Sequence, residues 1–329
     1  MTSIIQAEGL TKKYGDKTAV DQISFDIAEG ELFGFLGPNG AGKTTTIRML
    51  TTIASVTKGK ATVAGYDVAK NPGAVRARIG VVPQQLIADD ELTGMENVLL
   101  FAKLHHVRDE KALKRAAQLL QLVDLQGSAR KKAKTYSGGM KRRLQLAMGL
   151  VHDPAILFLD EPSLGLDIQT RAKMWDYVRK LNTDNGITVF MTTHYLEEAD
   201  ALCDRVAIVD GGTIKVSGSP AELKMRLGGD LLSIQVTSGT DLTGFLEGVQ
   251  DVKEVVRLSD AGYRIKIPRV EKALPEIVDG ITERGLKILD ISFTRPTLDQ
   301  VFLQVTGRQI RDGEGFGTPQ ISVLKEEKV

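Results

Sequence analysis

The sequence is poor in the residues that build disulfide frameworks, zinc clusters and base-stacking surfaces. Among 329 residues there is one cysteine, Cys203, and aromatic residues make up 5%. A single cysteine excludes an internal disulfide and a cysteine-rich zinc cluster, and it fits a reducing, cytoplasmic setting. The 43 basic and 42 acidic residues leave a net charge of +1. No overall field therefore favours nucleic acid or an anionic membrane.

Long apolar runs are also missing. No run approaches the roughly 20 residues that a membrane-spanning helix requires, and residues 1–8 lack the basic and apolar regions of a secretory signal. We therefore expect that the chain does not itself cross a bilayer. The hydrophobic content of 42% is ordinary for a globular protein, and the length allows one large domain and a smaller one.

One glycine-rich stretch organises the rest of the chain. Residues 37–45 fit G-x-x-x-x-G-K-[ST], and they lie between an apolar run at 32–36 and a helix-like run at 44–51. Glycines allow successive N–H groups to point at one phosphate, and the following helix adds its free N-terminal donors. The lysine would reach the β/γ-phosphates, and the first threonine hydroxyl would hold Mg²⁺. The predicted phosphate-binding residues are Gly37, Pro38, Asn39, Gly40, Ala41, Gly42, Lys43, Thr44 and Thr45.

A second apolar run, residues 155–159, ends in two carboxylates, Asp160 and Glu161. A continuous apolar run of this kind is typical of a central parallel strand that is buried on both faces. Asp160 is a candidate to hold magnesium through water, and Glu161 is a candidate to orient or deprotonate an attacking water. The alternative is a pair of exposed acids at the end of a strand.

Three isolated residues also follow strand-like segments. Tyr14, beside a turn glycine, could stack on a nucleotide base, although a half-buried strand aromatic has the same spacing. Gln84 could reach a metal or a water, with a surface glutamine as the alternative. His194 ends the strand-like run 188–193 and could sense a terminal phosphate, although a lone loop histidine is more often structural.

Residues 85–150 are predicted to be mainly helical. Thr93 and Glu96 form a capping box at the start of one helix. The basic runs 130–134 and 141–143 are interpreted as solvated helix faces, because few aromatic residues lie among them as a nucleic-acid site would need.

Another glycine-rich helix start follows the first basic run. Ser137 can cap the helix, and Gly138 and Gly139 leave the helix N–H groups accessible. This turn is therefore a second candidate for phosphate binding.

Together these segments resemble the nucleotide-binding subunit of an ABC transporter over about residues 3–228. Residues 37–45 match Walker A, 156–161 match Walker B with its catalytic glutamate, and 136–140 take the place of the family signature. The remaining matches are Gln84 at the Q-loop, 163–167 at the D-loop, His194 at the switch histidine and Tyr14 at the adenine-stacking aromatic.

The signature departs from the commonest Leu-Ser-Gly-Gly-Gln form. Tyr136 and Met140 replace the leucine and the glutamine, while the phosphate-facing Ser-Gly-Gly core is kept. This Tyr-Ser-Gly-Gly-Met form, followed by Lys-Arg-Arg, resembles the daunorubicin-resistance type of exporter ATPase. The segment 294–303, Thr-Arg-Pro-Thr-Leu-Asp-Gln-Val-Phe-Leu, is also similar to that group.

The resemblance implies an α/β P-loop NTPase fold, with a RecA-like core and a helical subdomain at about 85–150. It also implies that two subunits sandwich ATP and Mg²⁺. Catalytic roles then fall on Lys43, Gln84, Glu161 and His194, and Thr44, Gln84 and Asp160 would hold the metal. Ser137, Gly138 and Gly139 would close over a partner's nucleotide. The expected partners are a second ATP-binding subunit, which is another copy of this chain if the pair is a homodimer, and a membrane-spanning permease. The chain itself is expected to lie peripherally at the cytoplasmic face of the cell membrane.

A second domain is predicted at 229–307. Its strand and helix signals follow the order β-α-β-β-α-β of a ferredoxin-like fold, with a further helix at 298–305. We find no catalytic constellation in it, so an assembly or regulatory role and simple packing support both remain open. The glycine-containing tail 308–329 is predicted to be loose.

Two readings from other classes compete with the transporter. A soluble ABC ATPase of translation or chromosome maintenance would act on nucleic acid. Family members of the first kind usually carry two cassettes in one chain, and those of the second insert a long coiled coil between Walker A and the signature. This chain has one cassette and a short helical insert. A regulatory module with little turnover is disfavoured by the intact Glu161 and His194.

Overall fold

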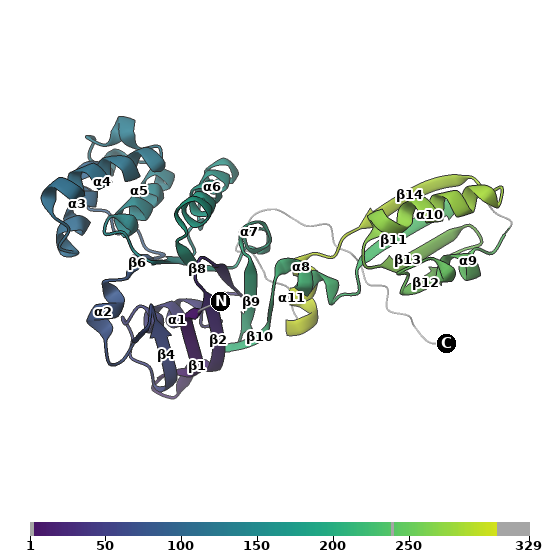
Figure 1. The fold of residues 1–329 in the computed structure, drawn as a ribbon, viewed down its shortest axis with the longest axis horizontal. Coiled ribbons are helices and arrows are strands. Elements are labelled where there is room, and N and C mark those ends of the chain that lie inside the picture. Colours follow the sequence, from purple (N-terminus) through teal and green to yellow (C-terminus); the bar gives the residue numbers. More distant parts are fainter. Residues whose placement is uncertain (1–2, 238–239, 308–329) are drawn as a thin grey trace.

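The computed structural model describes residues 3–237 and 240–307, and its first part is built on a mainly parallel six-stranded sheet (Figure 1). Neighbouring strands are parallel except for the β9–β10 hairpin. The strand order is β10-β9-β3-β8-β7-β6. In chain order the strands are β3 (Leu32–Leu36), β6 (Ile79–Val82), β7 (Ile156–Asp160), β8 (Thr188–Thr193), β9 (Arg205–Asp210) and β10 (Thr213–Gly218).

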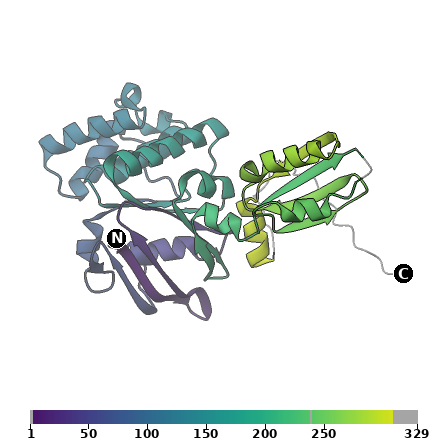
Figure 2. The same ribbon diagram turned by 45° about the vertical axis from the view of Figure 1, so that its right-hand side comes forward.

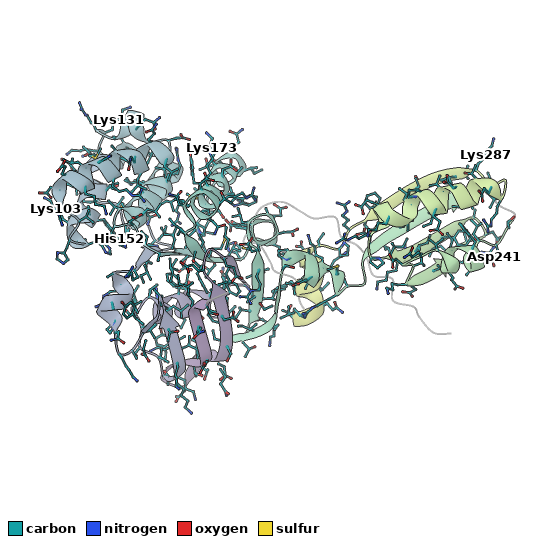
Figure 3. All side chains as sticks on the ribbon, in the orientation of Figure 1. Lys103, Lys131, His152, Lys173, Asp241 and Lys287 are labelled. Carbon is teal, nitrogen blue, oxygen red and sulfur yellow. The ribbon has the colours of Figure 1, made fainter. Side chains whose placement is uncertain are left out.

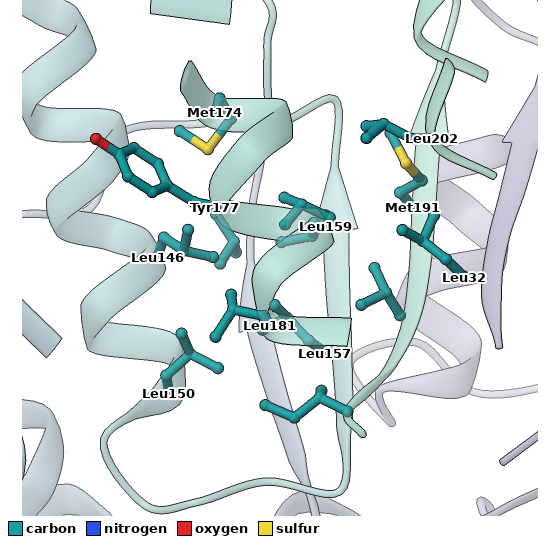
Figure 4. Close-up of a cluster of buried hydrophobic side chains, with 14 of the residues drawn as sticks. Leu32, Leu146, Leu150, Leu157, Leu159, Met174, Tyr177, Leu181, Met191 and Leu202 are labelled. Atoms are coloured by element: carbon teal, nitrogen blue, oxygen red, sulfur yellow. The ribbon is translucent and has the colours of Figure 1, made fainter. Parts of the chain in front are cut away.

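The central strands of this sheet are buried along their whole length, as their apolar sequences predict. On one face, side chains of α5 (Gly138–Leu150) and α6 (Ile168–Asn185) pack against β7. Figure 4 shows Leu146 and Leu150 of α5 and Leu181 of α6 beside Leu157 and Leu159 of β7. This packing fixes the carboxyl end of β7, where the two predicted acids lie.

An antiparallel sheet and α1 (Lys43–Leu50) cover the other face. The sheet has the order β2-β1-β4-β5, and Phe25 of β2 lies within 6.1 Å, ring centroid to centroid, of Phe33, Phe35 and Phe190 in the main sheet. The strands are β1 (Ser3–Tyr14), β2 (Lys17–Ala28), β4 (Lys58–Val63) and β5 (Tyr66–Asp67), and the short helix α2 (Pro72–Arg76) follows them.

The region 85–150 is helical, as predicted. The Thr93 and Glu96 capping box at the start of the first helix is confirmed, and Figure 3 shows Lys103 and Lys131 projecting from the outer surface of this part. The elements are α3 (Gly94–Leu104), α4 (Asp109–Leu122), the single-turn 3₁₀ helices η1 (Gln126–Ser128) and η2 (Ala133–Thr135), and then α5.

Beyond the main sheet the chain forms a separate antiparallel sheet with the order β12-β13-β11-β14. The β-α-β-β-α-β succession predicted for a ferredoxin-like fold is confirmed, and both inner strands pair only in antiparallel fashion. The elements are β11 (Asp230–Val236), α9 (Thr243–Gly248), β12 (Glu254–Arg257), β13 (Gly262–Ile267), α10 (Val270–Glu283) and β14 (Ile288–Thr294).

The last described helix does not stay with this second sheet. Leu298, Val301 and Phe302 of α11 (Leu298–Thr306) are buried in the core of the first part, together with Leu223 of α8 (Pro220–Met225). Figure 1 shows α11 beside α8 and away from α10, and α11 again lies next to α8 in the turned view of Figure 2. Sequence order alone had placed this helix in the second domain. α7 (Leu196–Leu202) lies nearby.

Among the residues that the structure describes, no helix combines the length and the apolar character that crossing a bilayer requires.

Candidate functional site

The glycine-rich loop lies between the buried end of β3 and α1. Gly40 and Gly42 adopt φ values of 81° and 100°, which side chains of L-residues rarely allow. A Cβ on Gly37 would lie 2.2 Å from the Val209 carbonyl oxygen, and one on Gly42 would lie 2.6 Å from the Ala19 carbonyl oxygen. The loop can therefore keep this tight path only with glycine at these positions.

Lys43, the first residue of α1, is almost fully buried beneath the loop. Its ammonium group donates to the carbonyl oxygens of Gly37 (2.6 Å) and Pro38 (3.2 Å) and lies 3.2 Å from Glu161 Oε1. Burial lowers the pKa of Lys43, while the charges of Glu161 and Asp160 oppose that shift. A bound phosphate would compete with Glu161 for this cation.

A pocket of about 630 Å³ opens in front of the loop. Tyr14, at the end of β1, lines it with a side chain that is 49% exposed, so part of the ring is accessible from the pocket. The other lining residues are Lys17, Thr18, Ala19, Pro38, Asn39, Gly40, Ala41, Gly42, Lys43, Thr44, Thr45, Gln84, Glu161, Gly211 and Gly212. Sequence analysis missed Lys17 and the two hairpin glycines.

The predicted metal ligands Thr44 and Asp160 lie together. Thr44 Oγ1 donates to Asp160 Oδ1 at 3.0 Å, and Thr192 Oγ1 of β8 donates to the same carboxylate oxygen at 2.6 Å. Hydroxyl and carboxylate oxygens are the hard donors that Mg²⁺ takes alongside substrate phosphates, so this donor set fits the metal. In the described chain no three acidic, histidine or cysteine side chains are placed to hold a metal ion together, so phosphate and water oxygens would have to complete the shell.

Glu161 is the centre of the polar site. Its φ of 50° is in the left-handed region, which is uncommon for a non-glycine residue and marks a strained position. Its carboxylate lies 3.3 Å from His194 Nδ1 and accepts a long 3.4 Å hydrogen bond from Gln84 Nε2. Burial would raise the pKa of Glu161, but the neighbouring His194 and Lys43 outweigh that effect and lower it.

The structure thus brings Lys43, Gln84, Glu161 and His194 to one point, although they come from four separate segments. A carboxylate held ionised at the mouth of a phosphate-binding loop can accept a proton from, or orient, a water molecule. Lys43 and the loop N–H groups can neutralise charge that develops on a phosphoryl group.

One of the basic runs does not behave as expected. Arg142 is 5% exposed, and its guanidinium donates to the carbonyl oxygens of Pro83 (2.9 Å) and Gln84 (2.8 Å). Gln145, one turn further along α5, donates to the Gln85 carbonyl oxygen at 2.7 Å. The interpretation of 141–143 as a solvated face is wrong for Arg142, which instead holds the backbone around Gln84.

The signature turn lies elsewhere. Ser137 caps α5 by accepting from the Met140 N–H at 3.2 Å, and Ser137 and Gly138 are exposed. A Cβ on Gly139 would lie 2.6 Å from Thr170 Cγ2 of α6. None of these three residues lines the pocket of the phosphate loop, so the chain does not bring its two candidate phosphate-binding turns together.

Thr192 and Arg142 are the positioning residues that sequence analysis missed. Thr192 is one of three threonines in β8, and threonine is common in strands, so it carries no signal of its own. The available sequence signal was its place two residues before His194; its pairing in register with Asp160 is seen only in the structure.

Comparison with protein families gives two matches. A family model for ABC transporters matches residues 20–164. A model described as the C-terminal domain of DrrA1-3-like ATP-binding proteins matches residues 218–306, which includes α11.

Similar curated proteins cover nearly the whole chain. The daunorubicin resistance ATP-binding protein DrrA3 of Streptomyces coeruleorubidus is 42% identical over 92% of this chain and 96% of its own length. The linearmycin resistance ATP-binding protein LnrL of Bacillus subtilis is 38% identical over 94% and 100%. The Nod factor export ATP-binding protein I of Sinorhizobium fredii is 37% identical over 94% and 87%.

Among solved structures, the dimeric post-hydrolysis ATP-binding cassette MJ0796, bound to ADP and Pi, is similar with a TM-score of 0.60. It is 27% identical, and the match covers 65% of this chain and 98% of that one.

Proposed function

Because this chain belongs to the ATP-binding subunits of ABC transporters and is an ATPase, we propose that it powers export of a drug-like, antibiotic or lipid-like cargo. The relatives named for daunorubicin, linearmycin and Nod factor support export over import. The cargo would pass through a separate membrane-spanning permease, and this subunit would act at the cytoplasmic face of the membrane.

The chemistry proposed for the site is transfer of the γ-phosphoryl group of ATP to water. The loop N–H groups and Lys43 bind the phosphates, and Thr44, Asp160 and Gln84 would hold Mg²⁺, which when bound offsets phosphate charge. Glu161 orients the attacking water and accepts its proton, because its carboxylate stays ionised. His194, 3.3 Å from that carboxylate, would contact the terminal phosphate.

The position of Ser137–Gly139 is the observation that carries the second half of the proposal. This turn presents exposed helix N–H donors outside the pocket of its own chain, so it can serve a nucleotide only on another subunit. A second copy, related by a two-fold axis, would complete both sites. Closure around ATP would then move the attached permease, and hydrolysis would reopen the pair.

For the rest of the chain we propose a cassette at 1–228, with its helical part at about 85–150, and an assembly or regulatory domain at 229–307. The burial of α11 in the cassette core supports a mechanical link between the two. The predicted loose tail 308–329 lies outside the described residues.

The proposal predicts a specific behaviour of Glu161→Gln. The amide keeps the size of the side chain but cannot accept the proton of water, so we expect kcat for ATP to fall by roughly 10²- to 10⁴-fold. ATP binding should persist, and the variant should elute as a dimer with saturating ATP in size-exclusion chromatography.

Glu197→Gln is the matched control, because Glu197 is exposed three residues after His194 and should leave kcat unchanged. A Glu161→Gln protein that stays monomeric with saturating ATP would contradict the closing dimer.

A further inference from the structure

A second buried glutamate lies just behind the catalytic cluster and has no part in the function proposed above. Glu198 is the third residue of α7 and is 0% exposed. A glutamate at this helix position usually turns outward to cap the helix. Here Glu198 Oε1 instead accepts from the indole N–H of Trp175 on α6, at 2.9 Å.

The side chains around the Glu198 carboxyl come from the segments next to Glu161 and His194. Burial raises the pKa of Glu198, while the hydroxyls of Thr193 and Ser163 and the indole N–H oppose the rise. Thr193 directly precedes His194, and Ser163 follows Glu161 by two residues. Among the described residues, neither Glu198 Oε2 nor Ser163 Oγ has a hydrogen-bond partner of good geometry. The Ser163 hydroxyl is thus close enough to act on the Glu198 carboxylate but lacks the geometry of a fully formed hydrogen bond, and such a buried contact requires an explanation.

The same face of α6 makes a second contact with the segment that follows His194. Arg171 and Trp175 are four residues apart and therefore lie on one side of the helix. The Arg171 guanidinium lies 4.2 Å from the centroid of the Tyr195 ring, and Trp175 binds Glu198. α6 thus contacts the side chains of two residues that follow His194, Tyr195 and Glu198.

We propose that Glu198 is a positioning residue, which ties the Ser163 loop and the start of α7 to α6 so that His194 stays beside Glu161. A fully formed hydrogen bond from the Ser163 hydroxyl to Glu198 Oε2 would satisfy both oxygens, so the network can tighten when the site closes. The inference rests on the proposed roles of Glu161 and His194. Because Glu198 does not line the nucleotide pocket, its loss should change kcat and not the KM for ATP.

The test compares the full-length chain with Glu198→Ala and Glu198→Gln in a steady-state ATPase assay. Alanine removes the network, and we expect kcat to fall roughly tenfold, as for other residues that orient catalytic groups, with KM within about twofold. Glutamine keeps an oxygen for Trp175 and gains a donor for Ser163, so kcat should recover to within about threefold of wild type.

Trp175 supplies a direct spectroscopic readout, because it is the only tryptophan in the chain. Its emission maximum should shift when Mg²⁺ and a non-hydrolysable ATP analogue saturate the wild type, and this shift should be absent in Glu198→Ala. Should alanine prevent folding, Trp175→Phe removes the N–H donor and keeps an aromatic ring, although a smaller one, and kcat should fall about fivefold.

Leu202→Ala controls for simple loss of stability, since Leu202 is a buried apolar residue on the same helix. If kcat in Glu198→Ala equals that of the wild type, or falls no further than in Leu202→Ala, Glu198 is only structural and the inference is overturned. Full turnover in Glu161→Gln would instead remove the proposed catalytic roles, so the two failures can be told apart.

Discussion

The chain contains two glycine-rich helix starts that differ in how far they are embedded. The phosphate loop before α1 has Lys43 buried beneath it, bonded to two loop carbonyls and paired with Glu161. The signature turn before α5 has one cap bond, from Met140 N–H to Ser137, and an exposed serine and glycine. Both offer helix N–H donors to an anion, but only the first is surrounded by catalytic groups of its own chain.

The difference explains why this ATPase would need a partner. A site that is complete in one chain needs no second copy in order to hydrolyse ATP. A site divided between an embedded half and an exposed half becomes complete only on closure, so the free energy of nucleotide binding can be coupled to movement of an attached protein. The two helix starts should therefore fail in different ways when they are mutated.

The largest effects are expected from substitutions that disable the embedded half and the exposed half of the site separately. Lys43→Ala removes the buried cation, and Ser137→Arg puts a bulky charge on the exposed turn. Each should lower kcat by roughly two orders of magnitude, as loss of a charge-stabilising donor does. Only Lys43→Ala should weaken ATP binding to the monomer, because Ser137 lies outside the pocket.

A mixture of the Lys43→Ala and Ser137→Arg proteins tests whether each nucleotide site is divided between two subunits. Half of the dimers would be mixed, and each mixed dimer would have one intact site of two, so the rate should recover to roughly a quarter of wild type. A mixture of two Lys43→Ala preparations is the control and should stay inactive. Absence of recovery, with mixed dimers demonstrated by tag capture, would show that the turn does not complete a partner's site.

A smaller effect is expected within the embedded half. Thr192→Val keeps the shape of the side chain but removes the hydroxyl that donates to Asp160 Oδ1 and accepts from the Glu161 N–H. Since both acids would lose orientation, we expect kcat to fall roughly tenfold and the Mg²⁺ concentration for half-maximal activity to rise. Both are measured by magnesium titration of the ATPase rate.

Thr188→Val is the matched control for this change. Thr188 is equally buried at the opposite end of β8, where its hydroxyl accepts from the Gly30 N–H. Thr188→Val should lower the melting temperature and leave the Mg²⁺ concentration for half-maximal activity unchanged. Equal magnesium dependence in both variants would show that Thr192 has only a structural role.

The embedded half also shows where sequence analysis succeeds and where it stops. The phosphate loop, the two strand-end acids and the capping box at Thr93 follow from local spacing, because their geometry is set within a few residues. The sequence predicts a solvated face for Arg142 because it lies in a basic run with few aromatic residues nearby. Its contacts are with the backbone of Pro83 and Gln84, some 60 residues away, and local pattern does not encode such contacts.

The same limit applies to the end of the chain. The pattern at 298–305 predicts a helix, and α11 confirms it, but the pattern does not say what the helix packs against. Its apolar face packs into the first part of the chain, which is far away in sequence. An amphipathic pattern states that a face is buried but not against which surface. The left-handed φ of Glu161 is likewise imposed by the tertiary setting.

The smallest expected effect concerns Tyr14 and changes only the binding of ATP to the embedded half of the site. Tyr14 lines the pocket with an exposed ring, and Lys12 Nζ lies 4.9 Å from the ring centroid. Removing a stacking partner of a base costs roughly 1 kcal/mol or more, so Tyr14→Ala should raise the KM for ATP about fivefold and leave kcat unchanged. Tyr14→Phe keeps the ring and should behave as wild type.

The same variants can be compared on the isolated monomer by titration with a fluorescent ATP analogue. Tyr14→Ala should weaken monomer binding, whereas Ser137→Arg should not, because only the first residue belongs to the embedded half. Equal affinity of Tyr14→Ala and wild type for the analogue would remove Tyr14 from the nucleotide site. Weaker monomer binding by Ser137→Arg would instead mean that the exposed turn serves its own chain, and the contrast between the two helix starts would no longer hold.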